Sequence, residues 1–206
     1  MHQLRSSKLF FKFRTSSRIN CGFFVDVNHL FGDDVPIKFL FRNFTHACAP
    51  TSLVIAARKA LAYVDHVLIL DGDAHYGDGT EDCLQHLGLA AQITNITRNQ
   101  IGAKAHSAYT AAKWRSFTSG LIDQYKPGLV IYQAGADAWD LDPYESGYLS
   151  MTGLKHRDEG VFRACKQAGV PVAWNLAGGY SDPMQLTIDI HLQTLAVSDA
   201  VIAGLG

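Results

Sequence analysis

Residues 66–80 read HVLILDGDAHYGDGT, a bulky apolar run followed directly by a loop of acidic residues and glycines. The apolar run, residues 66–70, is short and partly β-branched, which favours a buried strand. In open α/β sheets, ligands bind just beyond the carboxyl ends of the strands. Asp73 and His75 are two positions apart, so at an extended strand end their side chains are expected on the same side. Asp71 and Asp78 add two more carboxylates to the same loop, and together these residues predict a metal site.

Composition bounds the class of protein. The 206 residues suffice for one α/β domain with a sizeable core, and the hydrophobic fraction of 48% is ordinary for a soluble protein. A net charge of −1 gives no reason to expect a nucleic acid or an anionic membrane as partner, and no apolar run approaches a membrane span. The cysteines are scattered without a CxxC pair, which favours reduced thiols in a cytoplasmic protein.

The N-terminal part, residues 1–45, carries weak signals, and the rest of the chain, residues 46–206, is expected to form a single domain. Short strands are expected at Phe23–Val25 and Ile37–Phe41. The first 25 residues are basic and hold no Asp or Glu. This pattern favours a poorly specified start of a cytosolic protein, with an organellar transit peptide as the alternative.

From residue 53 onward, helical and strand patterns alternate. Helices are expected at Leu53–Val64, Ser107–Tyr125, Leu154–Gln167 and Met184–Leu205, and strands at His66–Leu70, Gly128–Gln133 and Pro171–Leu176. Such alternation predicts an α/β fold, a mostly parallel sheet with helices on both faces.

The strands expected at 128–133 and 171–176 also lead into loops with glycines and chemically distinctive side chains, as the strand at 66–70 does. Residues 135–137 read GAD, and residues 177–180 read AGGY. Because parallel strands end at the same edge of a sheet, the three loops are expected to converge. Asp140 and Asp142 lie further along the second loop, and we predict turn and capping roles for them rather than ligand roles.

Convergence would bring Asp73, His75 and Asp137 together as one histidine and two carboxylates. Three protein ligands plus an open position for water are typical of catalytic zinc. Such a metal lowers the pKa of bound water and polarises a carbonyl group. Tyr180, beside a glycine pair, is placed to donate a hydrogen bond to a developing oxyanion. Taken one at a time, these residues also fit turn-forming aspartates, a satisfied loop histidine and a rim aromatic residue.

The segments LILDGDAHYGDGT, YQAGADAWDLDP and WNLAGGY resemble the metal-binding and tyrosine motifs of the histone deacetylase family, in particular its bacterial-type deacetylase-like amidohydrolases. The resemblance covers roughly residues 46–195. It implies an arginase–deacetylase fold and hydrolysis of an acetyl-lysine-like amide or a small acetylated amine. It implies that Asp73, His75 and Asp137 bind Zn²⁺, with Fe²⁺ as an alternative, and that Tyr180 polarises the carbonyl. It also implies a structural K⁺ near Asp71.

One departure from the family pattern is serious, because the sequence contains no His-His pair. The family uses such a pair as general base and general acid. We hypothesise a deletion at the Ser52–Leu53 junction, which would leave the fold incomplete on its N-terminal side. The resemblance implies that Asp71 and Asp78 would be the carboxylates that contact the two histidines and fix their orientation. If buried and unpaired, these carboxylates would have raised pKa values.

The sequence therefore predicts a zinc-dependent deacetylase-like amidohydrolase whose activity is impaired, since proton transfer lacks an evident agent. His46 is a candidate substitute base, although loop histidines are usually just solvated. The main alternative is a non-catalytic metal-binding or interaction protein on the same fold. A manganese ureohydrolase is less favoured, because the segment after His75 lacks further ligands for a second metal. Direct contact with nucleic acid or membrane is not expected, and the oligomeric state is left open.

Overall fold

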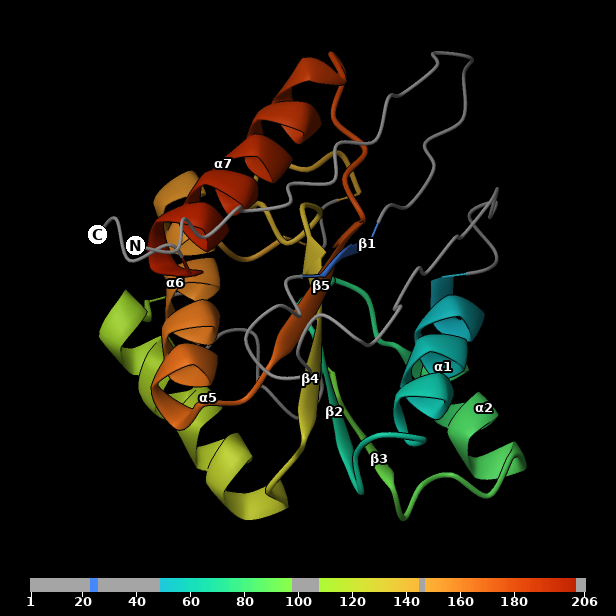
Figure 1. Cartoon of the computed structure of the whole chain (residues 1–206). Helices are drawn as coiled ribbons and strands as arrows, with labels where there is room; N and C mark the ends of the chain where they lie inside the picture. The colour runs from blue at the N-terminus through green and yellow to red at the C-terminus, as the bar shows by residue number, and fades with distance from the viewer. Residues whose placement is uncertain (1–22, 26–48, 98–107, 145–146, 203–206) are drawn as a thin grey trace, which may run out of the picture.

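A computed structural model describes residues 23–25, 49–97, 108–144 and 147–202 (Figure 1). Its centre is a five-stranded sheet in the order β1-β5-β4-β2-β3. In chain order the strands are β1 (Phe23–Val25), β2 (Val67–Asp71), β3 (Ile93–Ile96), β4 (Leu129–Gly135) and β5 (Val172–Ala177). All neighbouring pairs are parallel except β1, which runs antiparallel to β5. The predicted mostly parallel sheet is therefore confirmed.

Helices cover both faces of the sheet, as the alternation predicted. The helices are α1 (Ala49–Ala60), α2 (Asp78–His86), α5 (Ala111–Tyr125), α6 (Met151–Ala168) and α7 (Gln185–Ile202). Figure 1 shows α1 and α2 on one side of the sheet and α5, α6 and α7 on the other. None of these described helices has both the length and the apolar character that crossing a membrane requires.

The packing of strand β2 on both of its faces explains why its sequence is apolar at every position instead of alternating. Val67 and Ile69 pack in the cluster that includes α1 and α2 residues. Leu68 and Leu70 pack in the larger cluster with α5, α6 and α7 residues. A strand covered on both faces must be apolar at every position, because successive side chains point to opposite faces. Burying each of these side chains contributes roughly 1.5–3 kcal/mol.

The element boundaries differ from the expected ones where capping groups decide them. Helix α6 begins at Met151 because the Ser150 Oγ accepts a hydrogen bond from the Gly153 N–H at 3.1 Å. Helix α5 begins at Ala111, after the capping Thr110, rather than at the predicted Ser107. Strands β4 and β5 run one or two residues past their predicted ends, to Gly135 and Ala177.

Helix α1 begins at Ala49 and ends at Ala60, so the predicted span of Leu53–Val64 was displaced toward the C-terminus. Pro50 in its first turn is a favoured position for proline, since the first N–H groups of a helix have no partner within it. The Ser52–Leu53 step lies inside this helix, which continues through it without a break. The deletion at this step stays a hypothesis. The strand expected at 37–41 and the helix end expected at Leu205 lie outside the described residues.

Candidate metal centre

The first loop starts with a tight turn at the end of β2. Asp71 is the last residue of the strand, and it is 2% exposed. Its Oδ1 accepts hydrogen bonds from the Asp73 N–H at 3.0 Å and from Gln133 Nε2 at 2.9 Å. The Gly72 N–H donates to the Gln133 carbonyl at 2.9 Å. These bonds attach the loop to β4, so Asp73 emerges at a defined position beside the neighbouring strand end.

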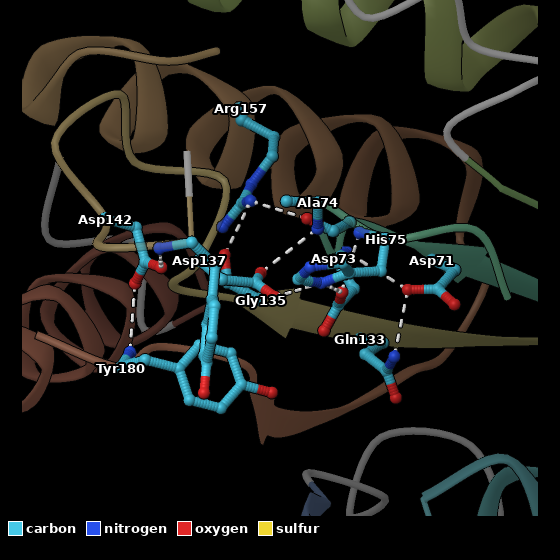
Figure 2. Close-up of polar contacts among 12 residues, drawn as sticks. Asp71, Asp73, Ala74, His75, Gln133, Gly135, Asp137, Asp142, Arg157 and Tyr180 are labelled. Atoms are coloured by element: carbon cyan, nitrogen blue, oxygen red, sulfur yellow. Dashed lines mark hydrogen bonds and ion pairs between the residues drawn. The ribbon is translucent and has the colours of Figure 1, made fainter. Parts of the chain in front are cut away.

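The side chains of Asp73, His75 and Asp137 come together at this edge of the sheet. One ligand atom from each lies within 4.8 Å of the others. His75 Nδ1 is 3.1 Å from Asp73 Oδ1 and 3.0 Å from Asp137 Oδ2, as Figure 2 shows. Asp137 is fully buried, Asp73 is 16% exposed and His75 is 48% exposed. The cluster therefore has a closed inner side and a side that is open to solvent.

The donor set fits a divalent metal. One imidazole nitrogen and two carboxylate oxygens are ligands that zinc accepts, with a further position left for water or substrate. Burial raises the pKa of Asp137 to about 8, and the adjacent Asp73 charge adds to this. Burial lowers the pKa of His75, but the Asp137 and Asp73 carboxylates outweigh it and raise the pKa overall. A bound cation would relieve the repulsion between the two carboxylates.

The buried carboxylates predict a pH-dependent stability for the metal-free chain. Burial, with the Asp73 charge, raises the pKa of Asp71 to about 7 from an ordinary 3.8. A group with a raised folded pKa contributes stability that is fully present below its unfolded pKa and is lost as pH rises through the folded value. In EDTA, the free energy of unfolding is therefore expected to fall between pH 5 and pH 8. The Asp71 share is on the order of 2 kcal/mol.

Urea unfolding of Asp71→Asn across the same pH range tests this expectation. Asparagine keeps the Oδ1 acceptor for Gln133 and the Asp73 N–H but cannot ionise, so the slope should become shallower. Asp78→Asn is the matched control, since Asp78 is exposed. A slope that Asp71→Asn leaves unchanged would contradict the assignment.

Tyr180 is held over the site by its backbone. Its N–H donates to Asp142 Oδ2 at 2.9 Å, and Asp142 Oδ1 accepts from the Tyr144 N–H at 3.2 Å. The Tyr180 ring packs edge-on against Tyr144, with centroids 4.5 Å apart, and lies 6.5 Å from the His75 ring. Burial raises the pKa of Tyr180 to about 12, and the Asp137 charge acts in the same direction. The hydroxyl is therefore protonated at neutral pH and can donate a hydrogen bond.

Replacement of Asp142 is expected to destabilise the chain, because the residue is only 4% exposed and its carboxylate accepts from two backbone N–H groups. Asp142→Ala should lower the free energy of unfolding by about 1–3 kcal/mol, the cost of leaving buried polar groups unpaired. Asp140→Ala in the same loop should change it by less than about 0.5 kcal/mol, since Asp140 is exposed. Urea titration of both variants checks this, and equal losses would contradict it.

Gly178 allows the loop after β5 to approach Asp137. Its φ is +44°, and a Cβ at this position would lie 2.2 Å from the Asp137 carboxyl carbon. Gly179 follows with a φ of +112°. Left-handed backbone favours glycine, and the contact with Asp137 leaves no room for any side chain. The glycine pair is thus required by both the backbone conformation and the packing.

The two carboxylates predicted to lie around the cluster, Asp71 and Asp78, differ in position and burial. Asp71 lies behind the cluster, whereas Asp78 is exposed at the first position of α2, with Oδ1 accepting from the Gly79 N–H at 2.8 Å. Asp71 is therefore buried but paired with the Asp73 N–H and Gln133 Nε2, so it meets only half of the expectation that these carboxylates would be buried and unpaired. His46 lies outside the described residues. Two residues that the sequence interpretation missed, Gln133 and Arg157, bond to this region.

A parallel α/β sheet with such a cluster at its strand ends is an arrangement found in metal-dependent hydrolases. Comparison with known families supplies the narrower assignment. The sequence model of the histone deacetylase domain family matches residues 89–195, just over half of the 206-residue chain. The chain therefore belongs to the histone deacetylase family, a family of hydrolases. The match includes Asp137 and Tyr180, while Asp73 and His75 precede it.

Two of the relatives described next are named histone deacetylases, in agreement with this assignment. The chain is 29% identical to histone deacetylase 2 of Arabidopsis thaliana over 167 residues, which cover 73% of the chain and 43% of that protein. It is 22% identical to histone deacetylase B of Dictyostelium discoideum, over 65% of the chain and 37% of that protein. An uncharacterised protein of Methanocaldococcus jannaschii is 26% identical, over 65% of the chain and 44% of that protein. The chain thus spans less than half the length of these relatives.

Proposed function

We propose that the chain is a zinc-dependent deacetylase-like amidohydrolase that acts on acetyl-lysine or a small acetylated amine, with impaired turnover. The observation that carries the proposal is the convergence of Asp73, His75 and Asp137 within 4.8 Å, beside Tyr180. A metal held there would polarise the substrate carbonyl and lower the pKa of its bound water. Fe²⁺ is the alternative ion, and a K⁺ near Asp71 is a further part of the proposal.

The side chains have distinct tasks in this scheme. Asp73, His75 and Asp137 would hold the metal, and the open side at His75 would admit the substrate. Tyr180 would donate its hydroxyl proton in a hydrogen bond to the carbonyl oxygen as negative charge develops there. Its high pKa, about 12, keeps the proton on the phenol oxygen during this step. Asp142 would keep the tyrosine in place through the bond to its backbone N–H.

The expected impairment follows from the absence of a His-His pair in the sequence. Asp71, which the family resemblance pairs with such a histidine, instead bonds two neutral donors, the Asp73 N–H and Gln133 Nε2. This observation also favours a second candidate function, a non-catalytic metal-binding protein on the same fold. A dinuclear manganese enzyme has less support, since only one cluster of three potential ligands occurs among the described residues.

Zinc titration followed by a hydrolysis assay tests the proposal. The purified chain is loaded with Zn²⁺ and given a fluorogenic acetyl-lysine peptide, with Fe²⁺ loading in parallel. Zinc binding with slow, chelator-sensitive hydrolysis would support the enzyme. Zinc binding without hydrolysis would favour the non-catalytic protein, and absence of binding to a folded chain would overturn both.

A further inference from the structure

Arg157 is a charged side chain in an unusual place. It sits in α6, between the core residues Leu154 and Val161, and it is 1% exposed. A guanidinium group stays charged in proteins, and burying a charge is costly unless the group is paired and hydrogen-bonded. Its bonds should therefore reveal what this helix position contributes to the molecule.

One nitrogen of Arg157 links the two loops that carry the proposed ligands. Nη1 donates to the Gly72 carbonyl and to the Gly135 carbonyl, each at 2.9 Å. Figure 2 shows Arg157 beside Gly135. Gly72 directly precedes Asp73, and Gly135 lies two positions before Asp137. The same atom thus fixes the backbone next to a carboxylate on each loop.

The position of the guanidinium is itself fixed, through Asp158. Arg157 Nε donates to Asp158 Oδ1 at 2.9 Å. The Tyr132 hydroxyl from β4 donates to the same oxygen at 2.6 Å, and the Thr194 hydroxyl from α7 donates to Oδ2 at 2.6 Å. Asp158 is fully buried, so this network connects α6, α7 and the sheet in a region without solvent. The guanidinium therefore has little freedom to move relative to the strand ends.

The two loops are also in close contact, so their spacing is sensitive. A Cβ added at Gly135 would lie 2.6 Å from the Asp73 Cα. The Ala74 N–H donates to Asp137 Oδ1 at 3.0 Å. A shift of either backbone would change the distance between the Asp73 and Asp137 carboxylates. Metal affinity depends on the groups that orient the ligands, and losing one typically costs 10- to 100-fold.

We propose that Arg157 is a positioning residue of the metal centre, which sets the distance between Asp73 and Asp137 by binding the Gly72 and Gly135 carbonyls. The proposal rests on the metal site of the proposed function. Arg157 touches neither the ligands' carboxylates nor a substrate in this scheme. Its effect is exerted through the backbone.

The test is a Zn²⁺ titration of the full chain with a competing chelator at pH 8, in the wild type and in Arg157 variants. Arg157→Met should weaken zinc binding by about 10- to 100-fold. Arg157→Lys should recover most of the affinity, because an ammonium group can donate to both carbonyls. Cobalt absorption in the visible range, which reports ligand geometry, should change in the methionine variant and return toward the wild type with lysine.

Controls separate positioning from general destabilisation. Val161→Ala removes core volume from the same helix, and Arg163→Met removes a half-buried ion pair with Glu159 that lies within the helix. Neither should change zinc affinity. If Arg157→Met fails to fold because the buried Asp158 charge has lost its cationic partner, the double variant Arg157→Met/Asp158→Asn removes both charges and should show the same loss.

The possible results are distinguishable. Wild-type affinity in Arg157→Met, or in the double variant, would overturn the positioning role and leave the proposed function intact. An equal loss in Val161→Ala would also overturn it, since destabilisation alone would then explain the effect. A folded wild-type chain that binds no zinc would overturn the proposed function and this inference with it.

Discussion

The zinc-loaded chain is expected to hydrolyse an acetyl-lysine peptide at least about a hundredfold more slowly than a family member that carries the paired histidines. General acid–base groups each contribute roughly 100- to 10,000-fold to a rate, because they move protons while the transition state forms. The sequence contains no adjacent histidines, and Tyr180, with a pKa of about 12, is poorly suited to accept a proton. Initial rates with both enzymes at matched zinc occupancy give the comparison.

Tyr180→Phe shows whether the residual rate belongs to the site. Loss of one hydrogen-bond donor to the developing oxyanion typically lowers kcat by about 100- to 1,000-fold. The variant should therefore reduce the remaining turnover to background while leaving zinc affinity unchanged. Wild-type turnover within tenfold of the intact relative, lost on Asp137→Ala, would contradict the expected impairment and point to another source of proton transfer.

Asp137→Ala is expected to weaken zinc binding by more than about a hundredfold, the upper end of what losing a ligand-orienting group costs. Asp137 is the fully buried member of the cluster, lies 3.0 Å from His75 Nδ1 and accepts from the Ala74 N–H. Its removal takes away a proposed metal ligand and a partner of His75 at once. Competition with a chromophoric chelator measures the affinity.

The matched control for Asp137→Ala is Asp140→Ala, which removes an exposed carboxylate from the same loop. Asp137→Asn serves as a second variant, because its amide oxygen still accepts from the Ala74 N–H while the negative charge is gone. An affinity within tenfold of the wild type in both Asp137 variants would show that this residue does not hold the metal. Loss in the alanine variant alone would indicate that the loop, rather than the carboxylate, had been disturbed.

Strong apolar runs made much of this architecture predictable. Strands β2, β4 and β5 are largely apolar in sequence and buried within the sheet. Each leads into a loop whose glycines and polar residues are easily recognised in the sequence. Parallel pairing then implies that the loops meet at one edge. Helix α2 and strand β3 escaped prediction, because α2 buries only Thr80 and Leu84, and β3 reads Ile-Thr-Asn-Ile. Neither offers a clear apolar period.

The residues around the cluster were harder to predict, because their role depends on distant contacts. Gln133 and Arg157 reach Asp71 and the Gly72 carbonyl across more than 60 positions of sequence. Arg157 could have been suspected, since Arg157 and Asp158 continue the same helix face as Leu154 and Val161. A charged pair on an apolar face indicates a buried network, but its partners come only from the three-dimensional structure.

The tight contact between Gly178 and the Asp137 carboxyl group has a bearing on how diverged relatives are interpreted. A Cβ there would stand 2.2 Å from the carboxyl carbon. Any mutation at this codon that introduces a side chain would displace the carboxylate, even with the Asp-x-His and Gly-Ala-Asp motifs unchanged. The identity of this one residue is therefore a simple diagnostic for sorting degenerate family members. Those that keep glycine retain the space for this arrangement, and those that have lost it are expected to hold the carboxylate in a different position.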